Sequence, residues 1–216
     1  MQLHSLGLHP RKRFSHAVWD SGAEALTRAL CDRLDARAVL SRVSRLVHDC
    51  NRPAGSKAAM PERSELIEVP GNVGLSASER AERARHVYHP FHAAVSETLD
   101  SFESPPAFLT IHTFAPTWHG ASRPVELGIL HDADDSLALR LLMRADPALK
   151  SALNEPYSAR DGVTHTLAVH AGPRGLQNAM IEVRNDLLAD DEAVDRMADR
   201  MAPMISGALS PTEVVQ

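Results

Sequence analysis

The stretch Phe108–Phe114, which reads FLTIHTF, decides the predicted fold of this chain. It is an apolar run of strand length, and prolines flank it on both sides, as breakers flank a buried strand. Residues 125–130 and 179–183 form two further apolar runs of strand length. We expect these three runs to be strands of a central sheet.

Helical patterns separate the predicted strands. Apolar residues recur at three- and four-residue spacing near the start of the chain, and Ser76 with Glu79 three positions later is a capping-box pattern. The predicted helices span residues 16–34, 76–99, 136–144 and 190–209. Strands that alternate with helices predict an α/β fold of three layers, in which helices flank a mostly parallel central sheet.

Weaker signals complete the predicted fold. Short apolar pieces that we expect as strands lie at residues 38–40, 46–47 and 166–170. Residues 53–74 are rich in Pro, Gly and Ser and predict a long loop, and residues 154–156 predict a turn. Pro90, in the sequence HPFH, is expected to end or kink the second helix, because proline cannot continue the hydrogen-bond ladder.

Composition limits the class of protein. The chain has 216 residues, of which 44% are hydrophobic, and this length predicts a single domain over residues 1–216. With 23 Lys and Arg against 28 Asp and Glu, the net charge of −5 leaves no broad basic field for a nucleic acid or an anionic membrane. Two cysteines fit a reducing compartment, and the sequence has neither a signal-peptide pattern nor a long apolar run. We therefore expect a cytoplasmic protein without a membrane span, whose oligomeric state the sequence leaves open.

Polar residues lie at the ends of the predicted strands, where the ligand sites of parallel sheets are found. His112, Glu182 with Arg184, and the pair Asn51 and Arg52 are candidates for such a site. Each has an ordinary alternative. His112 would be a hydrogen-bonded core histidine, Glu182 a partner of Arg184 or another arginine in a buried ion pair, and Asn51 and Arg52 turn residues. Together they suit a metal ion that polarises a carbonyl, a carboxylate general base and an arginine clamp for a substrate carboxylate.

Five segments, in this order, resemble the N-formylglutamate amidohydrolase family. They are SRLVHDCNRP at 44–53, HPFH at 89–92, TIHTF at 110–114, NEPYS at 154–158 and IEVRNDL at 181–187. The resemblance covers nearly the whole chain, from His16 to the last predicted helix. It implies the phosphorylase/hydrolase-like α/β fold that this family shares with zinc carboxypeptidases and the aspartoacylase group.

The resemblance also implies an activity, the zinc-dependent hydrolysis of an N-acylated acidic amino acid such as N-formylglutamate. His112 is similar to a zinc ligand of the zinc carboxypeptidases, and Glu182 is similar to the glutamate that activates water in those enzymes. Asn51 and Arg52 resemble the pair that grips the substrate carboxylate. The implied partner is therefore a small-molecule N-acyl amino acid. Further substrate-binding candidates are Arg45, Arg123, Arg184 and Tyr157, the last with simple packing as its alternative.

The other zinc ligands are less well defined. His16 and Asp20 stand at i and i+4 on one face of the first predicted helix and are the candidates beside His112, with a solvated first helical turn as the alternative. Members of the family begin with a strand and a histidine-containing turn that would lie upstream of Met1. We therefore expect a chain that is short at its N-terminus and binds zinc weakly. The alternatives are a catalytically impaired or non-catalytic relative that binds a carboxylate ligand or a partner, and a deacylase or carboxypeptidase-like enzyme with another acyl substrate.

Overall fold

The computed structural model describes residues 4–12, 17–64 and 66–210. The chain forms two compact units, which it visits alternately. Met1–Asp20 and Val39–Ser104 make up the first unit, and Ser21–Ala38 and Pro105–Gln216 make up the second. Each unit has an apolar core of its own. The expectation of a single domain over residues 1–216 stays a prediction.

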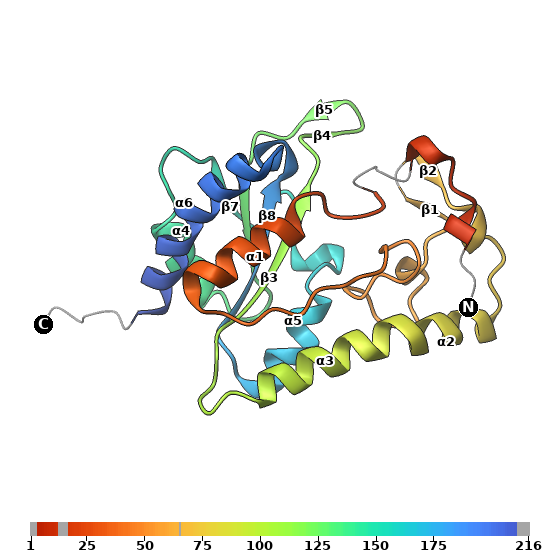
Figure 1. The fold of residues 1–216 in the computed structure, drawn as a ribbon, viewed down its shortest axis with the longest axis horizontal. Coiled ribbons are helices and arrows are strands. Elements are labelled where there is room, and N and C mark those ends of the chain that lie inside the picture. The colour runs from red at the N-terminus through yellow and green to blue at the C-terminus, as the bar shows by residue number, and fades with distance from the viewer. Residues whose placement is uncertain (1–3, 13–16, 65, 211–216) are drawn as a thin grey trace, which may run out of the picture. The chain divides into compact units, whose positions relative to one another are not determined.

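A four-stranded sheet forms the centre of the second unit (Figure 1). Its strands, in spatial order, are β3 (Phe108–Phe114), β8 (Asn178–Arg184), β6 (Leu127–Leu130) and β7 (Ser151–Leu153). β3 pairs with β8 in parallel, and β6 pairs with β7 in parallel, whereas β8 and β6 are antiparallel. The predicted α/β fold with a mostly parallel sheet is therefore confirmed. β3 has the predicted bounds, and β7 is a strand that the sequence did not predict.

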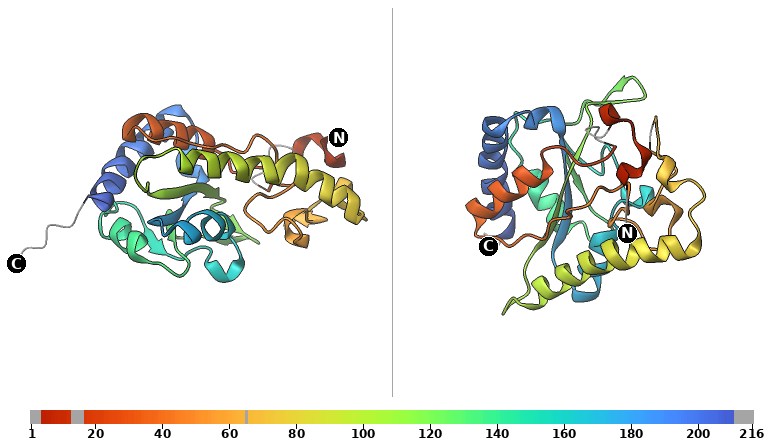
Figure 2. Two further views of the ribbon diagram at one scale, coloured as in Figure 1. Left: turned by 90° about the horizontal axis from the view of Figure 1, so that it is seen from below. Right: turned by 45° about the vertical axis from the view of Figure 1, so that its right-hand side comes forward.

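Helices cover both faces of this sheet. They are α1 (Ala23–Leu34), α4 (Ser136–Met143), α5 (His165–His170) and α6 (Asp191–Leu209). Ile129 and Ile181 project from one face into a core with α1, α4 and α6. Leu130 and Met180 project from the opposite face and pack with Leu167 of α5. Figure 2 shows α1 and α6 side by side, in agreement with their packing in the shared core.

The last helix begins where the sequence predicts. Asp190 precedes α6, and its side chain accepts a hydrogen bond of 2.8 Å from the backbone N–H of Ala193. The apolar residues of α6 recur at helical spacing and face the core. Within residues 4–12, 17–64 and 66–210, no helix is both long and apolar enough to cross a membrane.

A long helical segment lies in the first unit. It consists of α2 (Ala77–Arg83), a π-helical turn (Ala84–Tyr88) and α3 (His89–Asp100), one after another. The predicted capping box begins it, because the Ser76 side chain accepts from the N–H of Glu79 and the Glu79 side chain accepts from the N–H of Ser76. Pro90 does not end the helix. The wider π turn directly before it accommodates a residue that has no N–H to donate.

Two small antiparallel strand pairs complete the fold. They are β1 (Arg63–Ser64) with β2 (Ile67–Glu68) in the first unit, and β4 (Thr117–Trp118) with β5 (Ala121–Ser122) in the second. The first pair lies within residues 53–74, where the sequence predicts a loop, and it is too short to alter that description.

Three predicted strands are wrong. Residues 38–40 and 46–47 are not strands, and Val47 instead donates its N–H to the carbonyl of Ser44 in a turn, at 2.9 Å. A run of only two or three apolar residues can contribute to a core whether it lies in a turn or in a strand, so it does not predict a strand by itself. Residues 166–170 belong to α5, because Leu167 and His170 are buried at helical spacing on one side of it.

The first predicted helix begins later than expected. Gly22, just before α1, has a left-handed φ of 84°, and a Cβ at this position would lie 2.7 Å from the Cβ of Leu188. Asp20 precedes this break, so its predicted place on a helix face with His16 is wrong. His16 itself lies outside the described residues.

Candidate functional site

His112 and Glu182 are direct register partners in the parallel ladder of β3 and β8. Because side chains alternate between the faces of a sheet, register partners leave it on the same face. Glu182 is buried, with 4% of its surface exposed, and His112 is partly buried. The carboxyl group and the imidazole therefore lie side by side, two residues before the carboxyl ends of both strands at Phe114 and Arg184.

Gly128 is the register partner of Glu182 on its other side, in β6. A Cβ at position 128 would overlap the carbonyl oxygen of Glu155 and would lie 3.3 Å from the Cβ of Glu182. The missing side chain thus leaves room for the backbone of Glu155 to approach the sheet. A glycine inside a strand commonly marks such a close approach.

Asn154 fixes the segment that makes this approach. Its φ is 50°, in the left-handed region that asparagine tolerates better than most residues. Its backbone N–H donates to the carbonyl of Ile129 at 3.1 Å, and its side-chain oxygen accepts from the N–H of His131 at 3.1 Å. The side-chain nitrogen also lies 2.9 Å from Nε2 of His131. These bonds tie the turn predicted at residues 154–156 to the end of β6.

Arg123, a predicted substrate-binding residue, lies among aromatic rings. Its guanidinium carbon is 4.9 Å from the ring centres of both Trp118 and Tyr157, and 5.6 Å from that of Phe114. Its Nη1 donates to the hydroxyl of Tyr157 at 3.0 Å. Cation–π contacts hold a guanidinium in place without a carboxylate partner, so the aromatic rings position this positive group near the end of β3.

Arg184, another predicted substrate-binding residue, has two carboxylate partners. Its Nε donates to Asp186 at 2.8 Å, and its Nη2 lies 3.2 Å from Glu126. The hydrogen bond that Arg184 donates to Asp186, together with the charge of the Asp186 and Glu126 carboxylates, raises the pKa of Arg184. These contacts join the end of β8 to the segment before β6, and the ion pairs that the structure gives Arg184 are with Glu126 and Asp186.

The remaining predicted substrate-binding residues lie in the first unit, around Asp49. One oxygen of Asp49 accepts from Nη2 of Arg45 at 2.8 Å, and the other accepts from the backbone N–H of Asn51 at 2.9 Å. Arg52 donates from Nη1 to the carbonyl of Asn51 at 2.9 Å. Asp20 adds a second carboxylate, 3.5 Å from Nη1 of Arg45. The structure therefore brings Arg45, Asn51 and Arg52 into one cluster.

A catalytic zinc ion normally has three protein ligands. Across the described ranges of the chain, no group of three or more His, Cys, Asp and Glu side chains is arranged to hold a metal ion. His112 and Glu182 are two donors in register, and the predicted ligand His16 lies outside the described residues. The described donors alone therefore do not fit a three-ligand zinc site.

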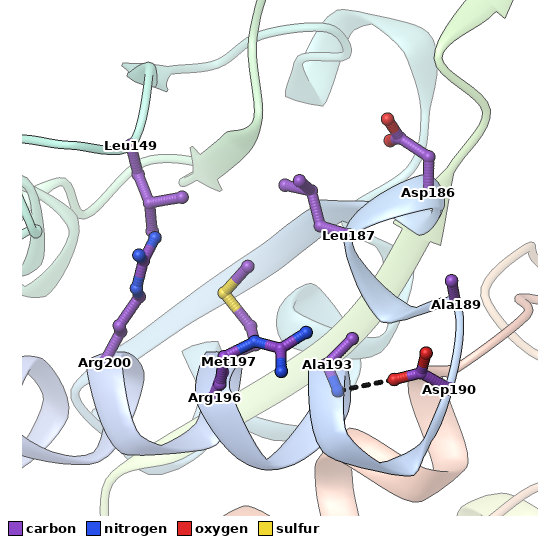
Figure 3. A pocket seen from close by; sticks show the side chains of 9 residues that line it. All are labelled: Leu149, Asp186, Leu187, Ala189, Asp190, Ala193, Arg196, Met197 and Arg200. Atoms are coloured by element: carbon purple, nitrogen blue, oxygen red, sulfur yellow. Dashed lines mark hydrogen bonds between the residues drawn. The ribbon is translucent and has the colours of Figure 1, made fainter.

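A separate pocket of about 340 Å³ lies where α6 begins (Figure 3). Its charged side chains already have partners. Arg196 lies 2.6 Å from Glu192, Arg200 lies 3.4 Å from Asp146, and Asp186 pairs with Arg184. Residues predicted to act on a substrate do not line this pocket.

Sequence reasoning missed Asp49, which organises the cluster of the first unit, and Gly128 and Asn154, which lie near Glu182 in the second unit. Asp49 stands inside the quoted segment at 44–53, and a carboxylate between two arginines and an asparagine is a signal for an organising ion pair. Gly128 is an isolated glycine in an apolar strand run, which is a signal for close backbone approach. In the sequence Asn154 has only the pattern of a turn residue, and nothing there indicates its bonds to His131.

The fold and the site together define a class, namely a mixed α/β protein with a carboxylate and an imidazole side by side near the carboxyl ends of parallel strands. A family model described as N-formylglutamate amidohydrolase matches residues 2–189. The chain belongs to the N-formylglutamate amidohydrolase family, so the resemblance seen in the sequence is confirmed. Membership implies hydrolase activity of the amidohydrolase type.

A solved structure is similar over almost the whole chain. The crystal structure of gene product Atu2144 from Agrobacterium tumefaciens is 44% identical in sequence, with a TM-score of 0.93. The match covers 96% of this chain and 84% of that chain. A search of curated proteins gave no match.

Proposed function

We propose that this protein hydrolyses the amide bond of an N-acyl acidic amino acid and that N-formylglutamate is its substrate. The observation that carries the proposal is the register of His112 with Glu182, in a member of the N-formylglutamate amidohydrolase family. The partner is then a small molecule. We place the reaction in the cytoplasm, as the composition predicts.

Glu182 is the proposed general base. Its carboxylate accepts a proton from the water that attacks the acyl carbon, and it gives this proton to the amine nitrogen as the carbon–nitrogen bond breaks. The products are formate and the free amino acid. The burial of Glu182 supports this role, because a charge in a site of low dielectric acts more strongly on its neighbours than a charge in water.

Arg52 is the proposed clamp for a substrate carboxylate, with Arg45 and Asn51 beside it. A planar guanidinium can donate two parallel hydrogen bonds to a carboxylate, which fixes the orientation as well as the position of the substrate. The hydrogen bond from Arg52 to the carbonyl of Asn51 supports this role, because it holds the guanidinium in one direction. Arg123, held by aromatic rings, is the proposed positive group of the second unit.

Zinc dependence is a separate part of the proposal. His112 is the ligand that we propose from the described residues, and the rest of the donor set includes His16. Zinc content measured on purified protein tests this part without reference to turnover. His112→Ala should lower zinc retention after dialysis, whereas His86→Ala, which changes an exposed histidine on the helical segment of the first unit, should not.

The test of the proposed base is the release of formate from N-formylglutamate by wild type and two matched variants. Glu182→Gln should lower kcat about a hundredfold to ten-thousandfold, because the amide retains the shape but cannot accept the proton. Glu192→Gln, which changes an exposed glutamate of α6, should leave kcat unchanged.

Two results would contradict the proposal. Unchanged turnover in Glu182→Gln would remove Glu182 as the base. Wild-type protein that releases no acyl group from N-formylglutamate, N-acetylglutamate or N-formylaspartate would favour a non-catalytic relative that binds a carboxylate ligand. Release of another acyl group alone would favour the deacylase alternative.

A further inference from the structure

Glu182 has a different neighbour on each side of its strand. On the β3 side its register partner is His112, and on the β6 side it is Gly128. Gly128 cannot carry a side chain without overlapping the carbonyl oxygen of Glu155, and this oxygen belongs to the backbone. A backbone group yields less easily than the end of a flexible side chain. The space beside Glu182 is therefore filled by the main chain of the segment that follows β7.

That segment is held at both of its ends. At its start, Asn154 is bonded to Ile129 and His131 at the end of β6. At its end, Tyr157 accepts a hydrogen bond from Arg123, whose guanidinium also stacks on the Tyr157 ring. Because both ends are fixed, the Glu155 carbonyl between them has little freedom to move away from Gly128.

We propose that Gly128 and Asn154 are positioning residues for the hydrolysis, an inference that rests on the proposed function. Gly128 admits the Glu155 backbone to the face of the sheet that carries Glu182. Asn154 locks this backbone in place. Glu182 is then confined between the backbone of residues 154–156 and the imidazole of His112, which directs its carboxylate along one line. The same segment also places Tyr157 against Arg123. It therefore positions both Glu182, the proposed base, and Arg123, the proposed positive group of the second unit.

The first experiment compares Gly128→Ala with Gly172→Ala. A Cβ at Gly172 meets no atom within 4 Å, so this variant is a matched control for the glycine-to-alanine change itself. Gly128→Ala should lower kcat about a hundredfold, because displacement of a catalytic group by an ångström costs this much. It should also shift the acidic limb of the kcat/KM profile against pH, which reports the ionisation of the free base, and Gly172→Ala should not.

The second experiment separates the backbone of Asn154 from its side chain. Asn154→Gly keeps the left-handed conformation accessible but removes the bonds to His131, and Asn154→Ala loses both. If the lock is the hydrogen-bonded side chain, both variants should lower kcat. Both should also speed hydrogen exchange at the amides of Glu155 and Tyr157, a readout that needs no turnover and that serves if Gly128→Ala fails to fold.

The outcomes are distinct. Unchanged exchange in both Asn154 variants, or turnover in Gly128→Ala equal to that of Gly172→Ala, would overturn the positioning role. Faster exchange with unchanged kcat and pH profile would also overturn it, because the segment would then be a structural feature only. If wild type hydrolyses no N-acyl amino acid, the proposed function is overturned and the positioning role falls with it, while the exchange data still show whether the lock exists.

Discussion

At the scale of single residues, Asp49 holds in place the turn that carries the proposed substrate clamp, Arg52. It is buried, and its two oxygens accept from Arg45 and from the backbone of Asn51. Each bond is charge-assisted and therefore stronger than a bond between neutral groups. The turn that carries Arg52 is thus fixed from within, before any substrate arrives.

Replacement of Arg52 by lysine tests the clamp. Lysine keeps the charge but loses the planar fork, so Arg52→Lys should raise KM for N-formylglutamate about tenfold with little change in kcat. Arg28→Lys, at an exposed ion pair with Glu24 on α1, is the matched control and should leave KM unchanged. Equal KM values for the two variants in steady-state kinetics would assign Arg52 to the turn alone.

The residues of the second-unit site differ in how far the sequence could predict them. His112 and Glu182 stood out because an imidazole and a carboxylate interrupt apolar strand runs, and buried charge requires a function or a partner. Their register could not be predicted, because it depends on which strands pair. Asn154 could not be predicted as a lock, because the bond to His131 depends on the placement of β6 beside β7.

At the scale of elements, the sequence predicted those whose pattern was long. β3, the helical segment from Ser76 and α6 are near their predicted places, since seven or more residues of consistent period leave few alternatives. The wrong predictions were short. The run 166–170 is compatible with a strand, but the spacing of Leu167 and His170 is compatible with a helix as well. The packing of Leu167 against Leu130 and Met180 decides in favour of the helix.

The capping box of α2 provides an element-scale test. Ser76→Ala removes the acceptor for the N–H of Glu79, so we expect the free energy of unfolding to fall by about 1 kcal/mol. Ser96→Ala, inside α3, should leave it unchanged or slightly higher, since alanine favours helix interiors. Urea denaturation of the two variants beside wild type measures the difference. A loss in Ser96→Ala as large as that in Ser76→Ala would mean that the cap contributes nothing specific.

At the scale of the whole molecule, both units bury titratable side chains as well as an apolar core. The second unit buries Glu182 and His170, and the first buries His48, His92 and Cys50. Burial lowers the pKa of His48 and of His92, and it raises the pKa of Cys50 to about 12. Nε2 of His92 lies 3.0 Å from the carbonyl of Cys50, and the ring of Tyr88 stacks 4.0 Å from the ring of His92.

Stability should therefore fall on acidification. The folded protein holds His48 and His92 with lowered pKa values, so the unfolded chain binds protons first as the pH falls below about 6.5. This contribution to stability is fully present above the unfolded pKa, and it is lost progressively as the pH falls toward the folded values. Urea denaturation at about pH 7.5 and 5.5 should show the loss.

A matched pair of variants assigns this loss to the buried histidines. His92→Asn keeps a side-chain donor for the Cys50 carbonyl but does not titrate, so the difference in unfolding free energy between the two pH values should shrink. His86→Asn changes an exposed histidine of the same helical segment and should leave the difference as in wild type. A wild-type protein that is equally stable at both pH values would show that burial does not lower the pKa values of these histidines enough to affect stability.

The alternation of the chain between its two units sets an order for assembly during synthesis. Every residue of the first unit has been made once Ser104 is added, so this unit can close early. α1 is made before most of that unit, yet its Leu26 and Leu30 belong to the core that α6 completes. α1 ends at Leu34 and α6 begins at Asp191, so the ribosome must add all the residues between them before α6 is made. Until α6 is made, the core that α1 shares with it is incomplete, so we expect part of the apolar face of α1 to stay accessible to chaperones during synthesis.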